Sequence, residues 1–252
     1  SKYIAGAGGG GGGGGKGGGG GRSGGGSSTP TEQDDSLQSK QFGQVLDLIS
    51  EGEIEGLDDG NKSVFLDGTP IQDSSGNNNF SGFTVVTRSG TQAQTYIPGD
   101  FGNVENEVAV GVEVTNASSV TRQITDTNVD RARITITVPS LQRFEDDGDI
   151  VGTSVSLDIQ VQYNGGGFNS VKSDTISGKS SSQYQRDYLI TLSGAFPVDI
   201  KVVRNTADTS STKLSNKTNW ASFTEIIDAK LRYPNSALVG LRFDSRQFNA
   251  IP

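Results

Sequence analysis

Acidic side chains are the main residues of this sequence that could take part in catalysis or bind a metal, because it contains neither histidine nor cysteine. Without these residue types the chain cannot build a Ser-His-Asp triad or supply the usual ligands of zinc, haem or iron–sulfur clusters. The remaining route to catalysis is a pair of close carboxylates, as in a glycosidase. The acids occur instead in turn-like strings, Asp34–Asp35, Asp58–Asp59 and Asp146–Asp147. We therefore expect no catalytic residue, no cofactor and no metal, and keep a carboxylate hydrolase as an alternative that needs a deep cleft.

The segment Arg143–Ile150 is the densest of these acidic stretches, with four carboxylates around Gly148. Oxygen ligands and a glycine turn suit calcium, but the alternating acids and closing glutamate of an EF-hand loop are missing. A solvated hairpin loop is the favoured interpretation. The shorter run Asp58–Asn61 predicts a turn for the same reason.

Glycine dominates the first part of the chain, where 17 of the 36 glycines fall within Gly6–Gly26. A dinucleotide fingerprint needs a strand before it and a helix after it, and a Walker loop needs Ser or Thr after its lysine, so neither nucleotide motif fits. Two interpretations remain open, a flexible tail and a peg that orders against neighbouring subunits. The peg interpretation is favoured, and it nominates Gly8, Gly12, Lys16 and Arg22 as assembly contacts.

Charge and hydropathy argue against further classes of protein. The net charge of −8 argues against nucleic-acid binding, which needs a surplus of Lys and Arg. No run of roughly 18 apolar residues could span a membrane, and the beginning of the chain lacks the apolar stretch of a signal peptide. We expect a soluble protein that is made and used without secretion.

From about residue 82 onward, apolar residues alternate with polar ones, which is typical of half-buried antiparallel strands. Gly- and Asn-rich turn signals separate the alternating runs, and this spacing predicts a β-sandwich with short connections. The alternating runs are Val108–Val114, Ala132–Val138, Val155–Tyr163, Tyr188–Leu192 and Val198–Val202.

Two further runs, Phe42–Ile49 and Phe223–Leu231, fit either helical or strand spacing. Both contain β-branched residues, and Pro234 blocks continuation of a helix and favours an extended Tyr233. We predict strands for both runs.

Two motifs at opposite ends of the chain resemble a known family. The first is Ile49–Gly56, followed by an Asp67–Gly68 hairpin signal, and the second is Thr224–Asp228 followed by Tyr233–Gly240. Together they resemble the N-terminal region of the tail-tip attachment proteins of lambda-type, long-tailed phages, the host-specificity protein J family. The resemblance covers most of residues 41–248, whereas the glycine-rich segment has no counterpart in it.

This resemblance implies an interrupted β hub domain that contains an inserted antiparallel β-sandwich, preceded by the glycine-rich extension. The implied boundaries are 1–40 for the extension, 41–75 and 220–252 for the two parts of the hub domain, and 76–219 for the insertion. Segments Phe42–Ile71 and Phe223–Phe248 would then belong to the same domain.

The implied function is that of a structural hub subunit in the virion, made in the host cytoplasm. It would form a homotrimer that closes the tail tube and supports receptor attachment and DNA delivery. The implied partners are neighbouring tail-tip and distal tail proteins, the tape measure protein, and a host receptor bound through further domains. The alternative is a carbohydrate-binding or adhesin β-sandwich module, which requires an exposed aromatic platform or a calcium site.

Three side chains leave two interpretations open. Trp220, the single tryptophan, is expected in the core, with a subunit interface as the alternative. Arg131 and Arg133 share one face of a predicted strand, where a solvated face is favoured over a site that pairs with an acidic neighbouring subunit.

Overall fold

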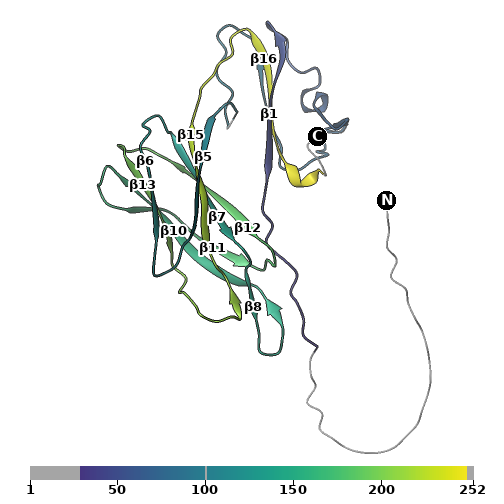
Figure 1. Ribbon diagram of the computed structural model, residues 1–252. Helices are drawn as coiled ribbons and strands as arrows, with labels where there is room; N and C mark the ends of the chain where they lie inside the picture. The colour runs from purple at the N-terminus through teal and green to yellow at the C-terminus, as the bar shows by residue number, and fades with distance from the viewer. Residues whose placement is uncertain (1–28, 100, 249–252) are drawn as a thin grey trace, which may run out of the picture.

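A computed structural model describes residues 29–99 and 101–248 of the chain (Figure 1). Strands dominate these residues, and the only helices among them are two 3-10 turns, η1 (Gly60–Ser63) and η2 (Ser245–Gln247). The predicted all-β class is confirmed. No helix within 29–99 and 101–248 is long and apolar enough to cross a membrane. The nominated contacts Gly8, Gly12, Lys16 and Arg22 lie outside the described residues.

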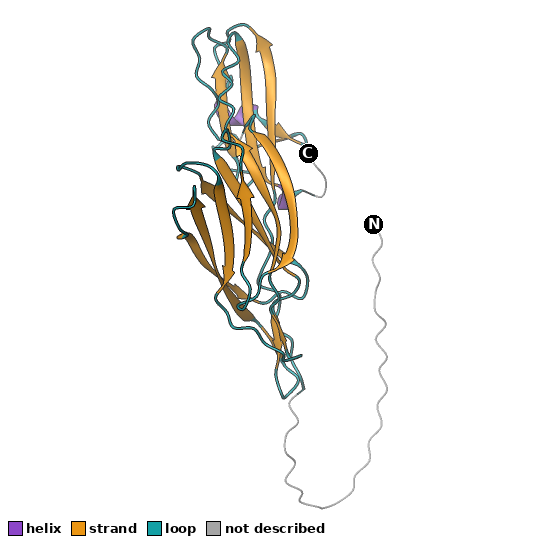
Figure 2. Ribbon diagram, turned by 60° about the vertical axis from the view of Figure 1, so that its left-hand side comes forward, coloured by secondary structure: helices purple, strands orange, loops and turns teal. Residues whose placement is uncertain are grey.

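Two four-stranded antiparallel sheets form a β-sandwich in the lower part of Figures 1 and 2. The strand orders are β11–β10–β13–β6 and β12–β7–β15–β5. Alternation sends one side of each strand inward: Ala132, Ile134, Ile136 and Val138 of one strand are all fully buried. The strands are β5 (Val104–Glu113), β6 (Val120–Ile124), β7 (Arg131–Val138), β10 (Thr153–Tyr163), β11 (Asn169–Gly178), β12 (Tyr184–Thr191), β13 (Val198–Arg204) and β15 (Asn219–Ile227).

A separate three-stranded sheet joins distant parts of the chain in the order β1–β16–β4. Its strands are β1 (Phe42–Glu51), β16 (Ser236–Asp244) and β4 (Thr84–Ser89). Phe42 pairs with Asp244 at one end of β1, and Glu51 pairs with Ser236 at the other. The strand prediction for Phe42–Ile49 is therefore correct, and that for Phe223–Leu231 is correct as far as Ile227.

Small hairpins complete the fold. Strands β2 (Phe65–Leu66) and β3 (Thr69–Pro70) flank Asp67 and Gly68, whose φ angles of 47° and 73° suit the tight turn that this Asp-Gly pair predicts. The acidic segment after Arg143 forms the loop between β8 (Gln142–Phe144) and β9 (Ile150–Val151), as predicted for a hairpin. Strand β14 (Leu214–Ser215) pairs with β8 on its other side.

Strand pairing differs from the expected domain boundaries at two places. Strand β4, which the boundary at residue 76 assigned to the insertion, pairs with β16 in the three-stranded sheet. Strand β15, assigned mostly to the second part of the hub domain, lies between β7 and β5 in the sandwich. The physical reason is that β15 carries two large side chains of the sandwich core, Trp220 and Phe223.

Candidate assembly surfaces

The two sequence motifs meet at one end of the three-stranded sheet. The backbone N–H of Gly52 donates to the carbonyl of Asn235 at 2.6 Å, and that of Ile54 donates to the carbonyl of Ser89 at 2.8 Å. Gly90 packs against this contact so closely that a Cβ atom there would lie 2.3 Å from the Gly52 oxygen. The motifs are therefore neighbours in space, and the close backbone approach requires glycine at position 90.

Gln94 ties the loop before β16 to the end of β4. Its side chain is buried, its Oε1 accepts from the N–H of Gly90 at 2.9 Å, and its Nε2 donates to the carbonyls of Tyr233 and Ser236. Beside it lies a cleft of about 550 Å³, whose lining includes Ile49, Ile54, Leu57, Thr87, Leu238 and Val239. Glu55 is the one carboxylate of this lining, so the cleft does not hold the close acid pair that a hydrolase needs.

A polar segment, Thr31–Ser39, crosses the base of the sandwich as a strap. The N–H groups of Ser36 and Leu37 donate to the carbonyl of Lys179, at 2.9 and 3.1 Å. The Lys179 side chain is buried, and its Nζ donates to Glu32 at 2.7 Å and to Asp35 at 2.8 Å. These contacts hold the strap against the base of the sandwich.

Hydrogen bonds favour the charged forms of Asp35 in the strap and of Lys179 in the sandwich. Those from Lys179 and Ser181 lower the pKa of Asp35 from its ordinary value of 3.8 to about 2. The hydrogen bond to Asp35 and, to a smaller extent, the one to Glu32 raise the pKa of Lys179. The pair is therefore charged across the neutral range.

Acid should weaken the strap between about pH 4 and about pH 2. Because the pKa of Asp35 is lowered in the folded chain, its stabilisation is complete above the unfolded value of 3.8 and is lost as the pH falls towards about 2. The protection of the Ser36 and Leu37 amides, taken relative to the intrinsic exchange rate at each pH, should fall in this window. Asp35→Asn should exchange faster already at pH 7 and show less acid dependence; equal profiles for both proteins would contradict this assignment.

Arg131 and Arg133 are partly buried in ion pairs within their own chain. Arg131 contacts Asp228, with Nε–Oδ1 and Nη2–Oδ1 distances of 2.9 and 2.5 Å. Arg133 donates to both carboxylate oxygens of Glu105, at 2.9 and 2.7 Å. The solvated face favoured for this pair is corrected, because carboxylates at the start of β5 and just after β15 reach both guanidinium groups. These contacts fasten the ends of β5 and β15 to β7.

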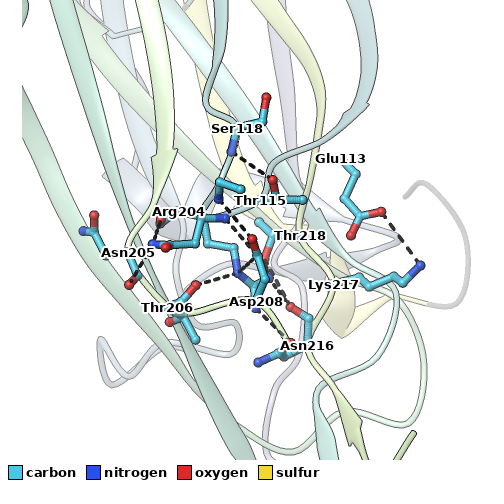
Figure 3. A network of polar contacts seen from close by, with 12 residues as sticks. Glu113, Thr115, Ser118, Arg204, Asn205, Thr206, Asp208, Asn216, Lys217 and Thr218 are labelled. Atoms are coloured by element: carbon cyan, nitrogen blue, oxygen red, sulfur yellow. Dashed lines mark hydrogen bonds and ion pairs between the residues drawn. The ribbon is translucent and has the colours of Figure 1, made fainter. Parts of the chain in front are cut away.

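Among the described residues, Arg204 is the most buried cation after Lys179, and it organises the segment between β13 and β15 (Figure 3). Its guanidinium donates to the carbonyl and side chain of Asn216 at 2.6 and 2.8 Å, to the Thr218 hydroxyl at 3.0 Å and to the Thr206 carbonyl at 3.0 Å. Burial lowers the pKa of Arg204, and the charge of Asp208 opposes that shift. Sequence reasoning missed this residue, although the inward alternation of Val198, Ile200 and Val202 continues to position 204.

Trp220 lies in the core of the sandwich, with no exposed surface. Its Nε1 donates to the carbonyl of Ser222 at 2.8 Å, and its ring centre lies 6.1 Å from that of Phe223. This position fits the core interpretation and leaves none of the side chain for a neighbouring subunit to contact. It is also the one nominated assembly contact that lies within the described residues.

Comparison with known proteins identifies the sandwich. A family model described as tip attachment protein J, FNIII-A domain, matches residues 104–229, which is half of the chain. The chain belongs to the tip attachment protein J family. The match begins at Val104, the first residue of β5, and ends two residues after β15, so the J-family domain coincides with the sandwich defined by strand pairing.

Two relatives extend this result beyond the sandwich. Tip attachment protein J of Escherichia phage SECphi4 is 40% identical over 228 residues, which is 88% of this chain and 20% of that protein. Tip attachment protein J of Escherichia phage SECphi27 is 36% identical over 220 residues, which is 87% of this chain and 18% of that protein. The chain therefore spans about a fifth of the length of these J proteins.

Similarity to solved structures is weak. A structure named "CBM4 structure and function" aligns with a TM-score of 0.24 and 11% identity, over 69% of this chain and 96% of that chain. A likeness at this level carries no argument about function.

Proposed function

We propose that the chain is a structural, non-catalytic hub subunit of a long-tailed phage tail tip. Three copies surround the tail axis, close the tail tube, and support receptor attachment and DNA delivery. The observation that carries the proposal is the J-family match over residues 104–229, together with 36–40% identity to two tip attachment proteins over most of the chain.

The proposed partners follow from this position in the virion. The chain contacts its own copies, neighbouring tail-tip and distal tail proteins, and the tape measure protein, while the host receptor is bound through other domains. Synthesis takes place in the host cytoplasm. The acidic balance of the chain, at −8, supports protein contacts over direct contacts with nucleic acid.

Assembled tails should contain three copies of this chain around one axis. We expect a reconstruction of purified tail tips to show threefold density, with β1 paired to β16 in every copy. Intact-mass measurement of tail tips gives an independent copy number. A hexameric arrangement would contradict the proposal.

Deleting Gly6–Gly26 should leave the thermal midpoint of the isolated chain unchanged and reduce its incorporation into tails. A peg that orders only against neighbours contributes nothing to the isolated domain, because intersubunit contacts alone offset its entropy cost. The control replaces the run with a Ser-rich sequence of equal length. If close backbone approach requires glycine, assembly should still fail with this control. Full infectivity of the deletion would show that the segment is idle.

A further inference from the structure

A cleft of about 1070 Å³ separates the start of β1 from the outer face of the β12–β7–β15–β5 sheet. Residues 38–42 and Arg242 line one side, and residues of β12 and β7 line the other. Its charged residues are four cations and two carboxylates, in a chain whose net charge is −8. This basic cleft therefore stands out from the rest of an acidic molecule. The charged residues are Lys40, Glu105, Arg133, Arg186, Asp187 and Arg242.

Two of the four cations are already committed to carboxylates of the same chain. Arg133 pairs with Glu105 at 2.7 Å, and Arg186 pairs with Asp174 at 2.7 Å. Lys40 and Arg242 form no ion pair with any residue in 29–99 or 101–248. The positive charge that remains for a partner therefore lies on these two residues, against one carboxylate of the cleft without an ion pair in the described ranges, Asp187, and with Lys40 also acting at longer range on Asp244.

Arg242 is held in an orientation that suits a carboxylate. Its guanidinium carbon lies 3.8 Å from the centre of the Phe42 ring, so the planar group stacks on an aromatic face. Stacking restricts the side chain and leaves its N–H edges free, and these edges match a carboxylate with two parallel hydrogen bonds. Phe42 itself is 40% exposed and provides an apolar floor beside the charge.

The complementary surface is on the same chain. The acidic segment Asp47–Asp59 contains six acids and no Lys or Arg, and all six acids are exposed. Only Asp59 has an ion-pair partner among the described residues, Lys62 at 3.5 Å. Five carboxylates thus remain unneutralised by the part of the chain that the structure describes: Asp47, Glu51, Glu53, Glu55 and Asp58.

A copy cannot place the centre of its acidic segment in its own basic cleft. Phe42 lies at the cleft, at the Asp244 end of β16, whereas Glu51 lies at the Ser236 end. Strand geometry puts Phe42 and Glu51 about 30 Å apart. We propose that the basic cleft of one copy binds the acidic segment of a second copy.

This contact is head-to-tail, because two different surfaces meet. Such interfaces generate closed rings when the rotation closes, and open filaments when it does not. The inference deepens the proposed function, on which it rests, by naming the surfaces that join neighbouring copies. The three copies proposed around the tail axis correspond to the closed ring and not to the open filament.

Charge reversal tests the contact in the full 252-residue chain. Lys40→Glu with Arg242→Glu makes the cleft acidic, and Glu51→Lys with Glu53→Lys and Glu55→Lys makes the segment basic. Sedimentation velocity at low ionic strength should show that wild type self-associates, and that either variant alone dissociates with a constant raised roughly tenfold or more. Mixing the two variants should restore association, because each cleft then meets a segment of opposite charge.

Matched controls separate this contact from general charge effects. Lys172→Glu with Lys217→Glu changes the net charge as much as the cleft variant does, but neither lysine lines the cleft, so association should persist. Circular dichroism melting confirms that each variant folds. Should Arg242→Glu impair folding, Arg242→Gln with Lys40→Gln replaces it, and labelled peptide 47–59 should bind wild type but not this variant.

The results that overturn the inference are specific. It fails if wild type stays monomeric at millimolar concentration, if the reversals leave association unchanged, or if the mixture does not recover. A threefold tail tip that tolerates both reversals would remove this contact and leave the hub function intact. Restored association in the mixture, together with a copy number other than three in tail tips, would support this contact and contradict the trimeric hub.

Discussion

Replacing Arg204 with methionine should lower the free energy of unfolding by about 2–5 kcal/mol. The methionine fills a similar volume, but it leaves the carbonyls of Thr206 and Asn216 and the Asn216 side chain without their donor in a buried site. Urea unfolding measures the change. We also expect the segment between β13 and β15 to gain protease sensitivity, because Arg204 donates hydrogen bonds that hold its carbonyls at Thr206 and Asn216 in place.

The matched control is Arg143→Met. Arg143 pairs with Glu145, but its side chain is 54% exposed, and a surface ion pair contributes only about 0–1 kcal/mol. Similar unfolding midpoints for the two variants would show that the Arg204 network adds nothing beyond its packing.

Truncating Trp220 to alanine should cost about 3–5 kcal/mol of stability in the isolated chain, because the side chain is fully buried and its removal leaves a cavity. Phe144→Ala is the control, since Phe144 is 37% exposed, and its loss should change the midpoint little. A Trp220 variant that melts like wild type but fails to enter tails would support the interface interpretation instead.

The single tryptophan also gives a direct test of burial. We expect a blue-shifted emission in the folded chain and weak quenching by acrylamide, both lost on unfolding. A red-shifted, strongly quenched signal from the folded chain would place Trp220 at the surface.

The sandwich strands could be predicted from the sequence because their alternation is local: the inward residues of β7 and β13 follow a period of two without interruption. Strand partnership could not be predicted in the same way. Residues Thr84–Ser89 read like any sandwich strand, and only their pairing with β16, about 150 residues further on, shows which sheet they join. The resemblance to the tail-tip family suggested that segments near residues 42 and 244 lie together, which fits the pairing of β1 with β16, but it set both borders of the insertion too early in the sequence, at 76 and 219.

The assembly surfaces were harder to predict. The strap has no periodicity, and its position depends on Lys179, which is more than 140 residues away in sequence. Arg204 was also missed, although its position in the inward-facing series of β13 was a signal of a buried cation. Part of the acidic segment Asp47–Asp59 was visible in the sequence as the motif Ile49–Gly56, whereas the stacking of Arg242 on Phe42 requires the β1–β16 register.

Pairing of Phe42 with Asp244 closes a loop of about 200 residues, which carries a large entropy cost if the chain between them is unstructured. The sandwich removes most of this cost, because Val104 of its first strand pairs directly with Ile227 of its last. Once the sandwich has folded, this pairing brings the segment that follows β4 close to the segment that precedes β16. From this connectivity we expect the sandwich to form first and the three-stranded sheet to close afterwards as a more local event.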